Sequence, residues 1–205
     1  MDEPKLFGDS RSGNCYKAAW LLRLTNTPFE WVETDVLQRH TRTAGFLALN
    51  PNGRVPLLVW PDGRRLAESN AILLHVSRDT GFFPADHWEQ ALVWQWLFFE
   101  QYSHEPYIAV ARFIVSLAHR AAEETERLAG LMERGYQALV VMEGALQDSA
   151  YFVGDRFTVA DIALYAYTHV AEEGGFDLQG YPAVRAWLDR VAAVPGYLSM
   201  AAACR

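Results

Sequence analysis

The sequence predicts a two-domain protein, with an α/β domain over residues 1–79, a linker over 80–85 and an all-helical domain over 86–205. Two observations predict this division. Short apolar runs typical of strands alternate with helix-like segments in the first part, and only helical periodicity follows the linker. The linker itself contains two helix and strand breakers, Gly81 and Pro84. A length of 205 residues is sufficient for two small domains.

The first domain is expected to have the element order βαβ-α-ββα, which gives a mixed sheet with helices on its faces. Pro61-Asp62-Gly63 is typical of a hairpin turn between two of its strands. The expected strands are 5–8, 29–34, 57–60 and 65–67, and the expected helices are 14–24, 43–49 and 69–78.

The second domain is expected to contain helices over 87 to about 119, 123–147, 158–172 and 182–194, followed by a short tail. Pro106 should kink the first of these helices, because proline removes one backbone donor. Thr158 and Asp161 have the spacing of a capping box, with Phe157 and Ile162 as a hydrophobic staple. A structural role is therefore the preferred interpretation of Asp161.

The charge distribution limits which partners the protein can bind. The net charge is −7, of which residues 1–79 carry +1 and residues 80–205 carry −8. This acidic helical half disfavours nucleic acid. No apolar run reaches the roughly 18 to 20 residues of a membrane span, and the N-terminus lacks the order of a signal peptide. Cys15 and Cys204 suggest no disulfide framework, so we expect a cytoplasmic protein. No residue spacing indicates a metal site.

Two short motifs together predict a site for the end of a peptide. Val55-Pro56 lies where a turn meets an apolar strand, and a cis bond there would turn the main chain of Val55 toward a bound peptide. Glu68-Ser69 ends a strand and opens a helix, whose first N–H groups favour a carboxylate beside a Glu that can meet an ammonium. Either motif alone is better explained by an ordinary strand–turn–strand with a serine cap, and the two together are much more specific.

With these motifs in this order, the chain resembles the serine-type cytosolic glutathione transferases of a bacterial-like branch. The resemblance rests on segments 5–8 (Lys-Leu-Phe-Gly), 12–17 (Ser-Gly-Asn-Cys-Tyr-Lys) and 50–56 (Asn-Pro-Asn-Gly-Arg-Val-Pro), on Glu68-Ser69, and on the capping segment 157–163. It covers essentially the whole chain. It implies a thioredoxin-like βαβαββα domain that binds glutathione, followed by the helical C-terminal domain of that family.

The resemblance implies that the Ser12 hydroxyl donates a hydrogen bond to the sulfur of glutathione, with Ser10 as the alternative. A hydroxyl donor and a helix N-terminus both favour the thiolate, which is the nucleophilic form of a thiol. Cys15 is expected to be buried one turn into the helix, which argues against exchange through a protein thiol. Asn14 either caps this helix or contacts the ligand. The implied glutathione contacts are Asn14, His40, Arg54, Val55, Pro56, Glu68 and Ser69, with Arg39, His40 or Arg54 meeting the glycyl carboxylate.

The implied activity is conjugation of the glutathione thiolate to a small hydrophobic electrophile, in a homodimer. An electrophile pocket between the domains is expected to be lined by Tyr102, Glu105, Ala109 and Phe113, which follow one another by three- and four-residue steps. A plain helical core explains the same spacing. Two alternatives stay open: a glutathione-dependent disulfide reductase or isomerase on this fold, and a non-catalytic glutathione-binding or assembly module.

Overall fold

The computed structural model describes residues 3–205 and divides into two compact units. Unit 1 combines the residues up to Thr80 with the tail Pro195–Arg205, and unit 2 is Gly81–Val194. Among the described residues, no helix is both long and apolar enough to cross a membrane.

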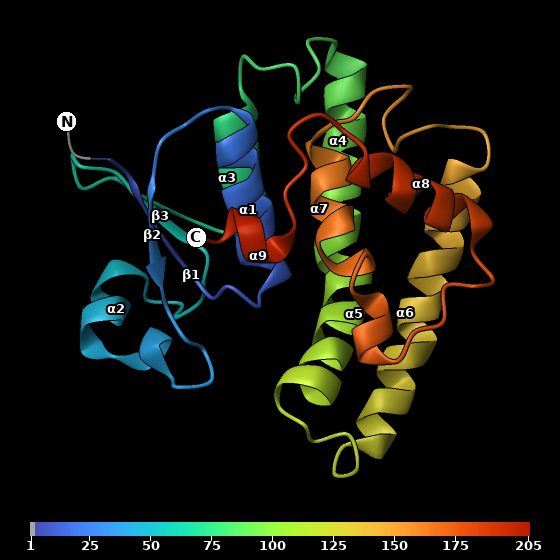
Figure 1. Ribbon diagram of the computed structural model, residues 1–205, viewed down its shortest axis with the longest axis horizontal. Helices are drawn as coiled ribbons and strands as arrows, with labels where there is room; N and C mark the ends of the chain where they lie inside the picture. Colours follow the sequence, from blue (N-terminus) through green and yellow to red (C-terminus); the bar gives the residue numbers. More distant parts are fainter. Residues whose placement is uncertain (1–2) are drawn as a thin grey trace. The chain divides into compact units, whose positions relative to one another are not determined.

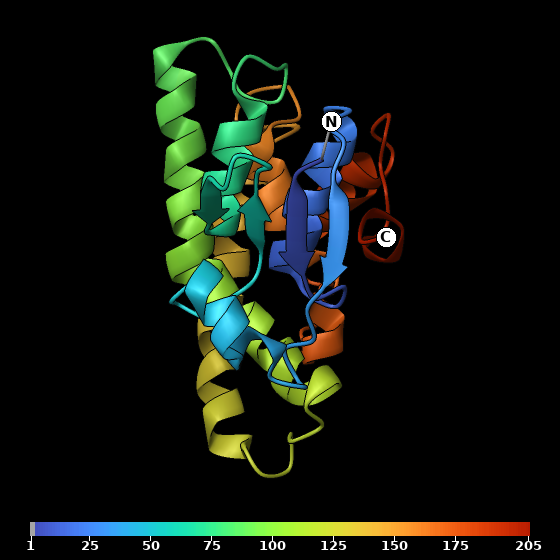
Figure 2. The same ribbon diagram turned by 90° about the vertical axis from the view of Figure 1, so that its left-hand side faces the viewer.

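Unit 1 is built on a mixed sheet of four strands, in the order β2-β1-β3-β4 (Figure 2). β1 runs parallel to β2, whereas β3 is antiparallel to both of its neighbours. The expected mixed sheet and the expected order of elements along the chain are therefore confirmed. The strands are β1 (Lys5–Gly8), β2 (Glu30–Glu33), β3 (Leu57–Val59) and β4 (Arg65–Ala67).

Three α-helices and a short 3-10 helix complete the thioredoxin-like part of unit 1. α1 and α3 lie side by side on one face of the sheet, and α2 lies on the other side (Figure 1). α1 is buried nearly all round, because every residue from Cys15 to Leu22 is at most 1% exposed. The helices are α1 (Gly13–Leu24), η1 (His40–Arg42), α2 (Ala44–Leu49) and α3 (Ser69–Ser77).

The C-terminal tail belongs to unit 1, which corrects the expected helical domain over 86–205. Its short helix α9 (Met200–Ala203) packs on α1. The Tyr16 hydroxyl donates a 2.7 Å hydrogen bond to the Leu198 carbonyl, and Trp20 Nε1 donates one of 3.1 Å to the Gly196 carbonyl. The tail thus supplies hydrogen-bond acceptors to two buried aromatic side chains.

Unit 2 is entirely helical, as expected. Its centre is α7 (Val159–Thr168), in which every residue is buried. α7 contacts α4, α5 and α8. The other elements are α4 (His87–Phe99), η2 (Glu100–His104), α5 (Glu105–Arg112), η3 (Phe113–Leu117), α6 (Thr125–Leu146), η4 (Ala171–Gly174) and α8 (Pro182–Ala192).

The long helical stretch that begins unit 2 changes its winding twice. η2 and η3 are π-helical, so their turns are wider than those of the α-helices around them. η2 ends two residues before Pro106, and the Glu105 N–H donates to the Glu100 carbonyl five residues earlier. The expected disturbance at Pro106 therefore takes the form of a π-helical segment within a continuing helix.

The capping box at the start of α7 is confirmed. The Thr158 N–H donates to Asp161 Oδ2 at 2.9 Å, and the Thr158 hydroxyl caps the first turn of the helix. Asp161 also accepts hydrogen bonds from Trp187 Nε1 at 3.0 Å and from the Phe152 N–H at 3.2 Å. Burial raises the pKa of Asp161 to about 6, although these hydrogen bonds act in the opposite direction. One carboxyl thus connects α7, α8 and the loop before α7.

We predict that Asp161→Ala lowers the free energy of unfolding by about 3 kcal/mol or more, because it leaves several buried donors without an acceptor. Denaturant unfolding monitored by tryptophan fluorescence measures this loss. Asp189→Ala, at an exposed position of α8, is the matched control and should unfold close to the wild type. Equal unfolding curves for the two variants would contradict a structural role for Asp161.

Candidate active site

Ser12 lies at the start of α1 and caps it. Its Oγ accepts from the Cys15 N–H at 3.4 Å, and its own N–H donates to the Asp9 carbonyl at 2.9 Å. Asn14 is therefore not the cap, and its contact with a ligand stays a prediction. A half-buried hydroxyl at the N-terminus of a 12-residue helix lies where an anion is favoured.

Ser10, the alternative to Ser12, has its hydroxyl engaged elsewhere. The Ser10 Oγ donates to Glu33 Oε1 at 3.3 Å, and the Ser10 N–H donates to the same oxygen at 3.1 Å. Glu33 also accepts from Trp31 Nε1 at 2.8 Å, which fixes the carboxylate. The Ser10 hydroxyl would have to leave this carboxylate to meet a ligand.

Cys15 is fully buried, as expected, and is unsuited to nucleophilic chemistry. Burial raises the pKa of its thiol to about 12, although hydrogen bonds from Ser12 and the Asp9 N–H act in the opposite direction. The Asp9 N–H donates to Cys15 Sγ at 3.4 Å. The thiol therefore stays protonated at neutral pH, when it is neither a strong nucleophile nor a metal ligand.

A side-chain hydrogen bond joins the start of α1 to the start of α3. The Ser69 hydroxyl donates to Asn14 Oδ1 at 3.1 Å, and Ser69 is buried at the first position of α3. The N-terminal ends of two helices therefore meet in one place. Both ends favour negative charge, and both carry residues that the sequence assigns to a ligand site.

Glu68 adopts a backbone conformation that is unusual for any residue with a side chain. Its φ is 66° and its ψ is 114°, and it precedes Ser69 without capping α3 through its side chain. Such outliers cost of order 1–3 kcal/mol and cluster at functional sites. The exposed Glu68 side chain and the first N–H groups of α3 are thus presented together at the strand end.

The loop before β3 forms the third side of the site. The Val55–Pro56 peptide bond is cis, as expected from the sequence. The Asn50 side chain donates to the Arg54 carbonyl at 2.8 Å and accepts from the Asn52 N–H at 3.2 Å, so it holds the turn that leads into Val55. Val55 is half-buried and Pro56 is buried directly before β3.

The basic residues expected to meet the glycyl carboxylate of glutathione lie beside this loop. A Cβ on Gly53 would lie 3.0 Å from the Thr41 carbonyl oxygen, so the segment that carries His40 packs against the turn that carries Arg54. Arg42 donates to the Asn52 carbonyl at 3.3 Å, which engages that guanidinium within the loop. His40 and Arg54 are both exposed, as is Arg39. These three residues therefore come from two neighbouring segments.

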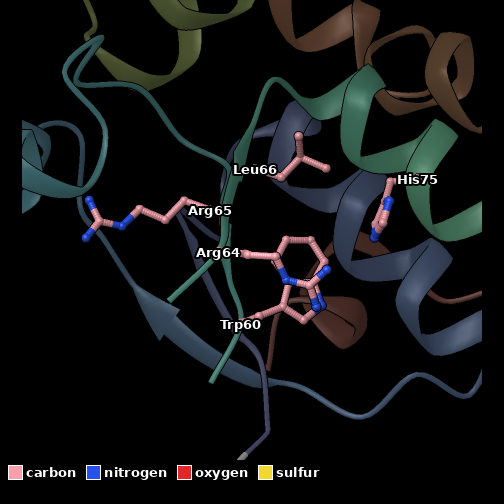
Figure 3. Close-up of a pocket in the computed structure, with 5 residues that line it drawn as sticks. All are labelled: Trp60, Arg64, Arg65, Leu66 and His75. Carbon is pink, nitrogen blue, oxygen red and sulfur yellow. The ribbon is translucent and has the colours of Figure 1, made fainter. Parts of the chain in front are cut away.

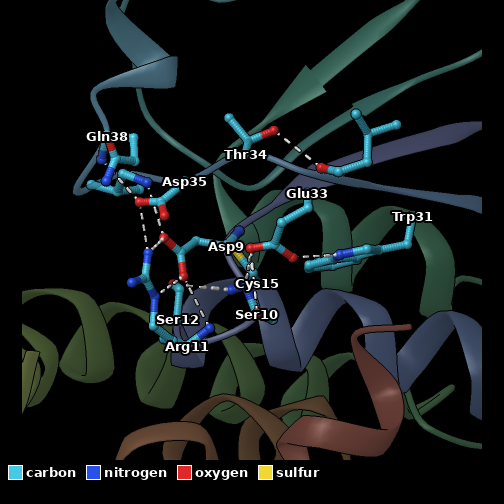
Figure 4. Close-up of polar contacts among 12 residues, drawn as sticks. Asp9, Ser10, Arg11, Ser12, Cys15, Trp31, Glu33, Thr34, Asp35 and Gln38 are labelled. Atoms are coloured by element: carbon cyan, nitrogen blue, oxygen red, sulfur yellow. Dashed lines mark hydrogen bonds and ion pairs between the residues drawn. The ribbon is translucent and has the colours of Figure 1, made fainter.

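An ion-pair cluster beside Ser12 was not anticipated from the sequence. The guanidinium of Arg11 lies between the carboxylates of Asp9 and Asp35 (Figure 4). Asp35 is 24 residues from Arg11 along the chain, and periodicity does not connect the two. The local Asp-x-Arg spacing was the one available signal.

The residues expected to contact an electrophile lie in unit 2. Tyr102 belongs to η2 and is 81% exposed, whereas Ala109 in α5 is buried. Glu105 and Phe113 are partly buried at the start of α5 and of η3. The prediction that these four residues share one helix face assumed α-helical spacing, which the π-helical turn at 100–104 changes. Their joint contact with an electrophile therefore stays a prediction. Over the part of the chain that the structure describes, no three His, Cys, Asp or Glu residues gather into a metal site.

The fold and this site define a protein with a thioredoxin-like first unit and a helical second unit. The model of the glutathione S-transferase N-terminal domain matches residues 11–78, and that of the C-terminal domain matches residues 97–195. The chain therefore belongs to the glutathione S-transferase family.

Individual relatives agree with this assignment. A glutathione S-transferase from Pseudomonas fluorescens is 51% identical, with a TM-score of 0.94 over 96% of this chain and 98% of that one. One from Xanthobacter autotrophicus is 52% identical, with a TM-score of 0.94 over 97% of each chain. Protein URE2 from Meyerozyma guilliermondii is 30% identical over 222 residues, covering 89% of this chain and 74% of that protein.

We predict that Glu68→Gly is more stable than Glu68→Ala by about 1 kcal/mol, because glycine adopts a positive φ without a steric cost. Thermal unfolding of the two variants tests the strain without any ligand. The control pair is Glu133→Gly and Glu133→Ala, at an exposed position inside α6, where the order should reverse by a similar amount. The same order at both positions would argue against strain at Glu68.

Proposed function

We propose that this protein conjugates the thiolate of glutathione to small hydrophobic electrophiles, with Ser12 as the catalytic residue. The hydrogen bond between Ser69 and Asn14 is the observation that carries the proposal. It joins the loop expected to activate the thiol to the loop expected to hold the γ-glutamyl end. Family membership supports the same conclusion.

The proposed roles follow the parts of the tripeptide. Glu68 meets the ammonium of the γ-glutamyl end, and Ser69 with the first N–H groups of α3 meets its carboxylate. The main chain of Val55, held by Pro56, pairs with the cysteinyl part as an added strand would. The glycyl carboxylate is received by Arg54 or His40, and Asn14 contacts the ligand near the sulfur.

The chemistry rests on the protonation state of the thiol. A cysteine thiol with a pKa near 8.5 is mostly protonated at neutral pH, but the thiolate is the nucleophile. The Ser12 hydroxyl donates to the sulfur while the N-terminus of α1 supplies a favourable field, so both lower the pKa of the bound thiol. The thiol proton leaves to solvent, and the thiolate attacks an electron-poor carbon. As the C–S bond forms, either a leaving group departs with the electron pair of its bond to that carbon, or the electrons of a polarised double bond shift away from it and a proton is taken up. Tyr102, Glu105, Ala109 and Phe113 are the proposed contacts to that electrophile.

Two other uses of the same site make different predictions. Reduction of a small disulfide would run through glutathione itself, because the buried Cys15 stays protonated, and an isomerase would return glutathione unchanged. A non-catalytic glutathione-binding module would bind glutathione without turnover. A cytoplasmic location also stays a prediction. Assays of conjugation, disulfide reduction and isomerisation on one enzyme preparation, alongside calorimetry with glutathione, distinguish these functions.

We predict that Ser12→Ala raises the pKa of bound glutathione and lowers the turnover number by about 10²–10³, because a donor to the developing anion is lost. Glutathione binding, expected in the micromolar to millimolar range from calorimetry, should change less. Ultraviolet absorbance of the thiolate against pH measures the shift. Ser10→Ala is the matched control, since the Ser10 hydroxyl is bound to Glu33. A shift in the Ser10 variant alone would reassign the role to Ser10.

We also propose that the protein is a two-fold symmetric homodimer, in which unit 1 of one subunit packs against the helices of unit 2 of the other. Large aromatic side chains are exposed along the start of unit 2, where Phe98 is 74% and Trp88 is 70% exposed. The +1 charge of residues 1–79 is complementary to the −8 charge of the remainder. Burial of exposed aromatic side chains stabilises such interfaces.

Unit 1 has a cavity suited to receive such a side chain. It has a volume of about 280 Å³ and is lined by Trp60, Arg64, Arg65, Leu66 and His75. The Trp60 and His75 rings are edge to face with centroids 5.2 Å apart, and Arg64 lies over Trp60 (Figure 3). An aromatic ring from a second copy would therefore find both aromatic and cationic neighbours.

We predict that the wild type sediments at about twice its 23.2 kDa chain mass and that Phe98→Glu sediments as a single chain. A carboxylate at a buried apolar interface carries a large desolvation cost. Val140→Glu, at a 61% exposed position of α6, is the matched control and should leave the dimer intact. Dissociation of the Val140 variant alone would place the interface on α6, and a monomeric wild type would reject the dimer.

A further inference from the structure

We propose that the Asp9–Arg11–Asp35 cluster is a positioning device for Ser12, and that Asp9 and Arg11 are positioning residues of the reaction. The proposal rests on the proposed function of Ser12. The cluster touches no reacting atom in this scheme. It acts by fixing the turn that carries the Ser12 hydroxyl to the start of α1.

The Asp9 carboxylate organises the cluster. Asp9 Oδ1 accepts from Arg11 Nε at 2.8 Å and from the Arg11 N–H at 3.0 Å. Asp9 Oδ2 accepts from Arg11 Nη2 at 2.6 Å and from the Val36 N–H at 3.0 Å. Four donors therefore fix a carboxylate whose residue is only 3% exposed. The two side-chain bonds form the bidentate pairing that only arginine can provide.

Arg11 extends the cluster to the segment after β2. Its Nη2 donates to Asp35 Oδ1 at 2.8 Å, and the same oxygen accepts from the Gln38 N–H at 2.9 Å. On the other side, Ser10 is bound to Glu33, as described above. The two residues before Ser12 are thus both tied to the chain around β2. The Ser12 N–H then donates to the carbonyl of Asp9, the same residue whose carboxylate binds the Arg11 guanidinium. Asp9 therefore holds both ends of this turn.

The net negative charge of the cluster disfavours formation of a thiolate nearby, whereas its hydrogen bonds favour the reaction by holding Ser12 in place. Burial by itself raises the pKa of Asp9, but hydrogen bonds from Arg11 and from the Val36 N–H outweigh it and hold this pKa below its usual value. The hydrogen bond from the Gln38 N–H and that from Arg11 lower the pKa of Asp35. Two negative charges therefore face one positive charge close to Ser12. By charge alone, this arrangement disfavours a thiolate.

The charge of the cluster and its positioning of Ser12 should shift the pKa of the bound thiol in opposite directions, so one experiment can separate the two effects. Asp9→Asn removes a negative charge, which alone would lower the pKa of bound glutathione, and it breaks the bidentate pair, which would raise that pKa by displacing Ser12. We expect the pKa of the bound thiol to rise by about half a unit or more. Arg11→Lys keeps the charge but loses the planar fork, so we expect a rise there too. Turnover should fall about tenfold in both variants, with the KM for glutathione changing less.

A ligand-free measurement tests the device independently of the proposed function. Amide hydrogen exchange at Ser12 and Cys15, whose N–H groups donate to the Asp9 carbonyl and to Ser12 Oγ, should accelerate about tenfold or more in both variants. The Thr34 N–H, which donates to the Gly8 carbonyl at 2.7 Å, should exchange as in the wild type. Asp62→Asn is the control variant, because Asp62 and Arg64 form the same Asp-x-Arg pair on an exposed hairpin. It should change neither the exchange at Ser12 nor the thiol pKa.

Each outcome bears on one proposal. A lower thiol pKa in Asp9→Asn with no change in Arg11→Lys would show that the cluster acts through charge alone, and would overturn the positioning role. Unchanged amide exchange at Ser12 and Cys15 would overturn it as well. A wild type that does not lower the pKa of glutathione would reject the proposed function, while the exchange data would still decide whether the cluster fixes the turn. Arg11→Lys keeps the test valid if Asp9→Asn fails to fold.

Discussion

The burial of α1 on every side is the constraint on which unit 1 depends. A helix with so little exposed surface needs neighbours on most of its sides: α3 and the C-terminal tail pack on it, and it lies on one face of the sheet (Figure 1). Aromatic contacts mark the cover, since Trp20 stacks on Tyr16 at 5.5 Å and meets Tyr197 edge to face at 5.6 Å. Close packing at the head of the helix also requires Gly8, where a Cβ would lie 2.3 Å from the Trp31 ring. The position of Ser12 follows from this packing.

The candidate site follows from what a buried helix leaves unsatisfied. The first N–H groups of α1 and α3 have no partner within their own helices, and both helices begin at the same end of the sheet. Ser12 satisfies part of this need for α1 by accepting from the Cys15 N–H. At α3, the Glu68 side chain makes no such cap, and the backbone takes a strained conformation instead. The strained Glu68 backbone therefore stands directly beside a helix N-terminus, a position that favours an anionic ligand.

Local patterns predicted most of the fold, because its elements are short and separated by clear breakers. The strands of unit 1, the start of α1, the capping box of α7 and the cis bond before Pro56 each depend on neighbouring residues. The errors came from contacts between distant segments. The tail was placed with the helical domain because nothing in its sequence reveals that Tyr16 and Trp20 donate hydrogen bonds to its carbonyls. The π-helical turns likewise depend on packing around Pro106 rather than on residue spacing.

The two Asp-x-Arg sequences show why the cluster at Ser12 could not be recognised from spacing alone. Asp9 and Asp62 each bind the backbone N–H and the guanidinium of the arginine two residues later. On the hairpin both side chains are more than half exposed, so water competes with the pair and it contributes little. At the start of α1 the aspartate is buried and a second segment supplies both a donor and a second carboxylate. The motif is therefore ordinary, and burial together with Asp35 turns it into a support for Ser12.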